Sequence, residues 1–270
     1  AWDPDVFRIS GSEGICHIMN KVCVIGGGAS GIMAAIAAAR NGADVVLLEQ
    51  KDRIGKKILV TGNGRCNLTN MQMTPACYRG EDTEFVFRAL HRFGVPDTLD
   101  FFKGLGVLTR AKGDYIYPLS NQASTILDAF AIELDRLHVT CHTGAAVVGV
   151  EPKRKGFCVH TEKGRITADK VILACGGKAA KVHGSDGSGY QIAKSLGHSM
   201  VPVVPALTAL QADGIFFKKS AGIRVEGTVF LYVDGDQVSA DRGELQLTDY
   251  GISGIPAFNV SRFAAKGLYR

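Results

Sequence analysis

"KVCVIGGGASGIMAAIAAARNGADVVLLEQ", residues 21–50, predicts a strand, a glycine-rich turn, a helix and a second strand in direct succession. Residues 21–25 are mostly β-branched, and residues 29–40 are rich in alanine, which favours a helix. Gly42 suits the end of that helix, and the apolar run 44–49 follows it. Strand, helix and strand in this order form the first unit of a doubly wound α/β sheet. We therefore expect an α/β fold that starts near Lys21.

The turn carries the spacing G-x-G-x-x-G, with Gly26, Gly28 and Gly31 at its glycine positions. In a dinucleotide-binding turn the first glycine permits the bend and the second lets backbone N–H groups approach a pyrophosphate. The third lets the helix pack closely on the strand. Glu49 ends the second strand, where a carboxylate can accept both ribose hydroxyls and would repel a ribose 2′-phosphate. We predict a dinucleotide site, and the alternative is a glycine-rich turn without a ligand.

The composition is that of a globular protein. With 270 residues, of which 46% are hydrophobic, the chain can bury a full core. Its formal net charge of +5 is spread along the chain without a basic block. The seven cysteines lack the spacing of a zinc site or a disulfide framework, so we expect reduced thiols, no metal and a cytoplasmic location. No apolar run suits a membrane span, and residues 1–18 lack both a signal-peptide pattern and the pattern of a fold.

The stretch "TGNGRCNLTN", residues 61–70, is the second informative feature. The residues before it look like a strand, and a long helical stretch is expected after it. With Lys56, Lys57 and Arg65 close to several glycines, the loop can lie along an extended anionic ligand. FAD fits this description better than NAD, because a simple nicotinamide dehydrogenase would continue into another helix and parallel strand. From the residues alone, an ordinary surface loop stays open.

Four segments, residues 55–70, 113–130, 171–210 and 243–262, together resemble the BaiN-like, aminoacetone-oxidase-like flavoproteins. The resemblance implies a glutathione-reductase-like domain with two dinucleotide-binding units, interrupted by an inserted domain. It also implies that FAD contacts a set of residues in the turn, the loop and the middle of the chain. By position, these are Gly26, Gly28, Ala29, Ser30, Gly31, Glu49, Gln50, Lys57, Thr61, Gly62, Asn63, Gly64, Arg65, Cys66, Asn67, Val147, Ala174, Cys175, Gly176 and Gly177.

The middle of the chain indicates a β-meander and a domain boundary. Three β-rich runs, residues 145–151, 156–161 and 164–177, predict a meander that leads into a buried strand. Residues 183–198 predict a glycine-rich turn and a helix with Ser188 as its N-cap. Pro202 and Pro205 then mark the boundary between an FAD-binding domain, residues 19–200, and an inserted β-rich domain, residues 201–270. In the second part, residues 234–236 (DGD) predict a hairpin turn.

These features predict an FAD-dependent oxidoreductase that passes a hydride or an electron pair between flavin and a small organic or steroid-like substrate. NAD(P)H is a candidate reductant, Lys57 and Arg65 are candidates for electrostatic stabilisation, and no catalytic acid or base emerges. We expect Cys175 to be a packing residue, since it has no partner cysteine two or three positions away.

Two alternatives remain. One is a nicotinamide-only dehydrogenase, and the other is a flavin-binding nucleic-acid-modifying or non-catalytic binding protein. We expect no nucleic-acid partner, because no basic stripe interleaved with aromatic residues appears. Members of the resembled family continue past this length, so we expect a C-terminal truncation that puts the completeness of the flavin site in doubt.

Overall fold

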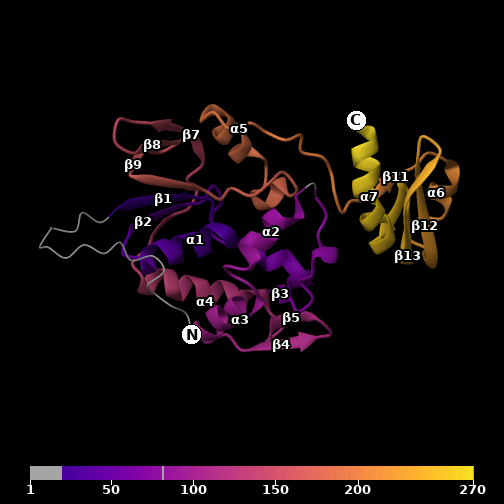
Figure 1. Cartoon of the computed structure of the whole chain (residues 1–270), viewed down its shortest axis with the longest axis horizontal. Helices are drawn as coiled ribbons and strands as arrows, with labels where there is room; N and C mark the ends of the chain where they lie inside the picture. Colours follow the sequence, from indigo (N-terminus) through magenta and orange to yellow (C-terminus); the bar gives the residue numbers. More distant parts are fainter. Residues whose placement is uncertain (1–19, 81, 270) are drawn as a thin grey trace, which may run out of the picture. The chain divides into compact units, whose positions relative to one another are not determined.

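The computed structural model describes residues 20–80 and 82–269, and the segment 1–18 that we expected to be outside the fold is not among them. The chain divides into two compact units between Ser199 and Met200 (Figure 1). Each unit is described by itself. No helix in the described part of the chain is both long and apolar enough to cross a membrane.

A four-stranded parallel sheet forms the centre of the first unit, in the order β10-β1-β2-β6 (Figure 1). Its strands are β1 (Lys21–Ile25), β2 (Asp44–Leu48), β6 (Thr140–His142) and β10 (Lys170–Leu173). The sequence runs of β1 and β2 are continuously apolar because both faces of the sheet are covered. Val22 and Val24 pack into one buried cluster, whereas Cys23 and Ile25 pack into the other. The predicted α/β Rossmann-like fold is therefore confirmed.

Different elements cover the two faces of this sheet. On one face, helices α1 (Ala29–Arg40) and α4 (Ala123–Arg136) contribute Ile32, Ile36 and Phe130 to the first cluster. On the other face lies a three-stranded antiparallel meander with the order β7-β8-β9. Its strands are β7 (Val147–Pro152), β8 (Phe157–Thr161) and β9 (Gly164–Ala168). The predicted meander is present, and it leads directly into β10. This strand is not the buried one that we expected, because its two central residues are half-buried and its two end residues are exposed.

The run before the "TGNGRCNLTN" loop is not the strand that we expected. Residues Ile58–Gly64 form the 3-10 segment η2, in which the Ile58 N–H donates to the Gly55 carbonyl at 2.8 Å. Gly62 and Asn63 have φ values of 55° and 59°, which a strand does not accommodate. The apolar character of this run instead reflects Ile58, which is buried in the first core cluster.

Short elements follow the loop, instead of one long helical stretch. A small antiparallel sheet has the order β3-β5-β4, with strands β3 (Thr69–Asn70), β4 (Thr109–Lys112) and β5 (Tyr115–Pro118). Between β3 and β4 lie helices α2 (Thr83–Leu90) and α3 (Val95–Gly104). Gly94 and Pro96 separate these two helices, because Gly94 is the N-cap of α3 and Pro96 lies in its first turn.

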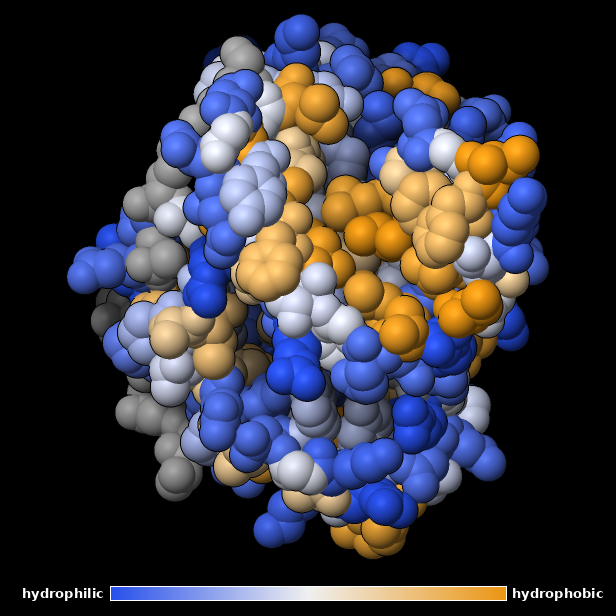
Figure 2. All heavy atoms as spheres, turned by 90° about the vertical axis from the view of Figure 1, so that its right-hand side faces the viewer, coloured by the Kyte–Doolittle hydropathy of each residue, from blue (hydrophilic) through white to orange (hydrophobic). Residues whose placement is uncertain are grey.

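The second unit is an antiparallel sheet with the order β11-β14-β13-β12. The elements are β11 (Leu210–Gln211), α6 (Ile215–Lys219), β12 (Arg224–Val233), β13 (Asp236–Thr248), β14 (Gly251–Gly254) and α7 (Ile255–Leu268). Asp234 and Gly235, with φ values of 54° and 96°, form the predicted hairpin turn. Figure 2 views the molecule from the side on which α6 and β12 lie in Figure 1, and it shows apolar side chains gathered on that side. That this unit is an inserted domain stays a prediction.

A buried ion network joins the far end of α1 to α4. The Glu133 carboxylate, in a residue that is 5% exposed, accepts hydrogen bonds from Arg40 at 2.6 and 2.9 Å. It also accepts from Arg136 at 2.7 and 2.9 Å. Hydrogen bonds from Arg136, together with Arg40, lower the pKa of Glu133 from 4.5 to about 2. Because each carboxylate oxygen has a charged donor, the network fixes α1 against α4.

Replacement of Glu133 by glutamine should destabilise the protein in a pH-dependent way. At pH 7 we expect the free energy of unfolding to fall by about 2 kcal/mol, because the charged hydrogen bonds are weakened inside the fold. The folded-state pKa of Glu133 is depressed, so its contribution is complete above about pH 4.5 and is lost as the pH falls toward about 2. Urea unfolding of both proteins at pH 7, 4 and 3 measures this difference.

The exposed Glu84 on α2 provides the control, since Glu84→Gln should leave the free energy of unfolding nearly unchanged at pH 7. An equal difference between wild type and Glu133→Gln at every pH would contradict the assignment of the effect to this carboxylate.

Candidate functional site

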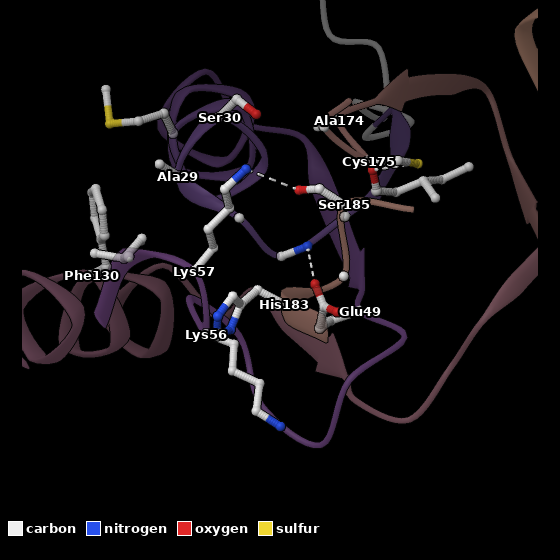
Figure 3. A pocket seen from close by; sticks show the side chains of 18 of the residues that line it. Ala29, Ser30, Glu49, Lys56, Lys57, Phe130, Ala174, Cys175, His183 and Ser185 are labelled. Atoms are coloured by element: carbon white, nitrogen blue, oxygen red, sulfur yellow. Dashed lines mark hydrogen bonds between the residues drawn. The ribbon is translucent and has the colours of Figure 1, made fainter. Parts of the chain in front are cut away.

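A cavity of about 770 Å³ opens at the carboxyl ends of β1, β2 and β10 in the first unit (Figure 3). Ile25, Leu48 and Ala174, which lie at or just beyond these strand ends, are part of its wall. Ligands of open α/β sheets bind outside the carboxyl ends of the strands. The volume lies within the range of about 300–1,000 Å³ that is usual for small-molecule and cofactor sites. This cavity is therefore the candidate site.

The three glycines of the G-x-G-x-x-G turn meet three different constraints. Gly26 has a φ of 110°, and a Cβ atom on it would overlap the Ala174 carbonyl oxygen. A Cβ atom on Gly31 would overlap the Gly26 carbonyl oxygen, which lies directly under the first turn of α1. A Cβ atom on Gly28 would meet nothing within 4 Å, and Gly28 lines the cavity. Gly26 thus permits the bend, Gly31 permits the close approach of the helix, and Gly28 leaves space for a ligand.

The amino end of α1 lies at the cavity. Ala29 and Ser30, the first two residues of the helix, line its wall (Figure 3). No side chain caps this end among the described residues, and the first turn contains no acidic residue. The N–H groups of a first helical turn carry a partial positive charge and lack intrahelical partners. An anionic group such as a pyrophosphate suits this position.

The carboxylate of Glu49 is held at the wall by backbone groups. Its Oε2 atom accepts the Gly27 N–H at 2.8 Å (Figure 3). Its Oε1 atom accepts the Lys51 N–H at 2.8 Å. Each carboxylate oxygen can accept more than one hydrogen bond, so both oxygens can also take a hydroxyl donor from a ligand. The carboxylate is therefore oriented in advance, and its binding to a ribose stays a prediction.

Residues 184–188, here called the 184–188 segment, contact the residues that follow β2. Gln50 Nε2 donates to the Gly184 carbonyl at 2.8 Å, and Lys57 Nζ donates to the buried Ser185 hydroxyl at 3.3 Å (Figure 3). Gly184, Ser185, Asp186 and Ser188 line the cavity beside Gln50 and Lys57. Two parts of the chain more than 120 residues apart thus form one rim.

Ser188 is not the N-cap that we expected. It is the first residue of α5 (Ser188–Ser195), and Gly187, with a φ of 87°, occupies the N-cap position. The Asp186 carboxylate accepts the Ser188 N–H at 3.0 Å, and this hydrogen bond lowers the pKa of Asp186. The first N–H group of α5 is therefore bound by the Asp186 carboxylate, and the Ser188 hydroxyl does not cap the helix.

The "TGNGRCNLTN" loop contributes to the cavity through only part of its length. Thr61, Cys66, Asn67 and Leu68 line it, as do Lys56 and Lys57 before the loop. Gly62, Asn63, Gly64 and Arg65 do not line it. The Arg65 guanidinium instead donates to the Gly62 carbonyl at 3.2 Å and lies 5.5 Å from the centre of the Tyr117 ring. Arg65 therefore stabilises the loop itself in this structure, and its contact with FAD stays a prediction.

The predicted residues from the middle of the chain lie mostly at the same cavity. Val147, Ala174, Cys175 and Gly176 line it, whereas Gly177 does not. Burial raises the pKa of the Cys175 thiol to about 11, and burial also raises the pKa of Cys66. Thiols of this kind are largely protonated at pH 7 and are poor nucleophiles. This favours the packing role expected for Cys175. The described residues contain no cluster of three or more side chains suited to hold a metal.

Sequence reasoning missed an aromatic part of the wall. Phe93, Phe101, Phe102 and Phe130 all line the cavity and come from α3, α4 and the residue run before α3. Figure 3 shows Phe130 on the side of α4, across the cavity from Glu49. These phenylalanines have no common spacing in the sequence, so only the packing of the helices brings them together.

Comparison with known proteins identifies relatives of this chain. Residues 20–261 match the family described as the HI0933-like protein Rossmann domain. The chain is 53% identical over 253 residues to a 3-dehydro-bile acid delta(4,6)-reductase of Clostridium scindens, covering 93% of this chain and 62% of that protein. It is 26% identical over 249 residues to a ribosomal RNA dihydrouridine synthase of Escherichia coli, covering 91% of this chain and 61% of that protein. The chain thus spans less than two thirds of each relative.

Among solved structures, the fold is similar to that of 3-ketosteroid-delta4-(5alpha)-dehydrogenase from Rhodococcus jostii RHA1 in complex with 4-androstene-3,17-dione. The TM-score is 0.54 and the identity 17%, with 81% of this chain and 62% of that chain covered. At this identity the likeness concerns the fold alone.

The open position at Gly28 gives a test of the site. Gly28→Val should leave the melting temperature close to that of the wild type, because no heavy atom beyond its chain neighbours lies within 4 Å of the added Cβ. The same change should weaken ADP binding more than tenfold, since the side chain fills the space beside the helix terminus where a pyrophosphate would lie. Titration calorimetry with ADP and thermal melts followed by circular dichroism measure both effects.

Gly31→Ala is the matched comparison, because its Cβ overlaps the Gly26 carbonyl oxygen and should lower the melting temperature. Unchanged ADP affinity in Gly28→Val would exclude this turn from nucleotide binding.

Proposed function

The chain belongs to the HI0933-like Rossmann-domain family, and on that premise we propose that it binds FAD and serves the oxidoreduction of a steroid-like substrate. One observation carries the proposal: the uncapped amino end of α1, the oriented Glu49 carboxylate and Lys57 all lie at one cavity beside the strand ends. The name of the relative that is 53% identical, a bile acid reductase, supports the class of substrate. NAD(P)H is the proposed reductant.

The donors and acceptors at the cavity fit the parts of FAD. The N–H groups at the start of α1 would hold the pyrophosphate, with the space left by Gly28 as its cradle. Glu49 would accept the ribose hydroxyls, and the backbone at Val147 would lie beside the adenine. Lys57, Thr61, Cys66 and Asn67 would then face the isoalloxazine. FAD, when bound, supplies the chemistry of hydride or electron-pair transfer.

The protein's own residues would orient and stabilise the bound group. Lys57 Nζ donates a hydrogen bond to the Ser185 hydroxyl at 3.3 Å. This bond restrains the Lys57 side chain, which is otherwise exposed. A positive charge held beside a flavin favours the negative charge of its reduced form. The hydrogen bond from Gln50 to the Gly184 carbonyl would fix the rim beside the adenosine part of the cofactor. No described residue is assigned as a catalytic acid or base.

A second candidate function is modification of a nucleic acid. The observation that favours it is the identity of 26% to a ribosomal RNA dihydrouridine synthase. Both candidates use the same cofactor-type cavity, so they differ in what approaches it. We favour the steroid-like substrate because the identity to the bile acid reductase is twice as high over a similar length.

Glu49 gives the test of FAD binding. Glu49→Ala should raise the dissociation constant for FAD about tenfold to a hundredfold, because a charged acceptor for the ribose hydroxyls is lost. Glu49→Gln should have a smaller effect, since one side-chain oxygen remains to accept the Gly27 N–H. Quenching of flavin fluorescence on titration measures the constant. An unchanged constant in Glu49→Ala would remove this carboxylate from the cofactor site.

RNA binding separates the two candidate functions. If the substrate is steroid-like, a uridine-containing ribosomal RNA fragment should be retained weakly and without a steep dependence on salt. Filter binding at 50, 100 and 200 mM potassium chloride measures the slope of log affinity against log salt. A steep slope, which reports several phosphate contacts, would favour the RNA candidate and count against the proposed substrate.

A further inference from the structure

One end of the cavity is a wall of four phenylalanines, here called the phenylalanine wall: Phe93, Phe101, Phe102 and Phe130. We propose that this wall is the subsite for the substrate and that it selects apolar, fused-ring molecules over nucleobases. The inference rests on the proposed function, because it takes FAD to occupy the part of the cavity between Glu49 and the loop residues Thr61–Asn67.

The rings of the wall pack around Phe101, edge to face with Phe93 and Phe102 and tilted against Phe130. Its ring centre lies 5.3 Å from that of Phe102, 6.3 Å from that of Phe130 and 6.5 Å from that of Phe93. The planes of Phe101 and Phe102 meet at 86°, and those of Phe93 and Phe101 at 71°. Offset and edge-to-face pairs of this kind hold rings in defined orientations. The wall is thus a fixed surface.

The four rings differ in their exposure. Phe102 and Phe130 are 7% and 2% exposed and belong to the hydrophobic core. Phe101 is half-buried, and Phe93 is 41% exposed. The buried pair therefore serves packing, whereas Phe93 and Phe101 are free to contact a ligand. Because Phe93 is the exposed member, a molecule entering from solvent can reach the wall at this residue.

The ion network behind the wall fixes Phe101. The Arg40 guanidinium lies 5.2 Å from the centre of the Phe101 ring, in a cation–π contact. Glu133 holds the same guanidinium at 2.6 Å. Arg40 and Glu133 are therefore positioning residues, since they act on the wall through Phe101.

The scarcity of polar groups on the wall suits a fused-ring molecule better than a base. Among the described lining residues between positions 93 and 130, Thr98 alone has a polar side chain. The Thr98 hydroxyl donates its hydrogen to the Gly94 carbonyl at 2.8 Å, so the wall offers a ligand apolar ring surface and no free side-chain donor. A steroid-like molecule can place its rings on the phenylalanines. A nucleobase carries donors and acceptors around its edges, and this wall would leave most of them unpaired at a cost in free energy.

The cofactor ring fits this wall less well than the substrate does. The pyrimidine side of isoalloxazine presents carbonyl and N–H groups, which need polar partners. Lys57 and Asn67 carry such partners, whereas Thr98, the polar lining side chain of α3, already donates its hydrogen to the Gly94 carbonyl. The wall therefore suits the molecule that lies next to the flavin.

The test is the binding of 4-androstene-3,17-dione to the FAD-loaded protein, measured by titration calorimetry. Phe93→Ala and Phe101→Leu should each weaken steroid binding, Phe93→Ala by roughly tenfold, because contact with an exposed ring is lost. The dissociation constant for FAD should be unchanged in both variants, and uridine should not compete with the steroid. Phe85→Ala is the matched control, since Phe85 is 67% exposed but does not line the cavity.

Each other outcome overturns the inference. Unchanged steroid affinity in both variants would make the wall a packing feature. Equal weakening of FAD would assign the wall to the cofactor, and competition by uridine would remove the proposed selectivity. If the wild-type protein takes up no FAD, the proposed function fails. The same steroid titration on cofactor-free protein, with Phe93→Ala beside Phe85→Ala, then decides the inference about the wall by itself.

Discussion

The first turn of α1 can lie against the end of β1 only because Gly26 and Gly31 lack side chains. A Cβ atom on either residue would overlap a carbonyl oxygen, that of Ala174 or that of Gly26. The close approach directs the amino end of the helix to the carboxyl edge of the sheet, where the cavity opens. At its other end, α1 is joined to α4 by the Arg40–Glu133 ion pair. Both the position of the helix and the wall that α4 helps to form depend on these two contacts.

Much of this arrangement could be predicted from short-range signals in the sequence. The glycine spacing in residues 26–31, the β-rich runs of the meander and the Asp234–Gly235 turn each fix local backbone geometry, and the structure contains all three. The apolar run at residues 58–60 was misleading, because three residues do not distinguish a strand from a buried turn. The orientation of Arg65 toward Tyr117 and the meeting of Phe93 with Phe130 depend on tertiary packing, for which the sequence holds no periodic signal.

The cavity joins two kinds of surface. Around Gly26–Ser30 and Glu49 it presents backbone N–H groups and a carboxylate held by backbone, which suit a nucleotide of fixed shape. Around α3 and α4 it presents mostly apolar and aromatic side chains. In our proposal the first surface binds FAD and the second selects the substrate. Under this proposal, chains similar to one another over this region would keep the first surface and differ in the second, and the relatives named as a bile acid reductase and as an RNA dihydrouridine synthase would then differ in substrate for that reason.

The central claim is that the cavity at the strand ends is an FAD site, and one titration tests it most directly. The purified chain, freed of any bound cofactor, is titrated with FAD and separately with NAD in a calorimeter, and ADP is then added to the FAD complex. The account predicts saturable binding of one FAD per chain, displacement by ADP and weaker binding of NAD. Tighter binding of NAD than of FAD, or FAD binding that ADP does not displace, would contradict it.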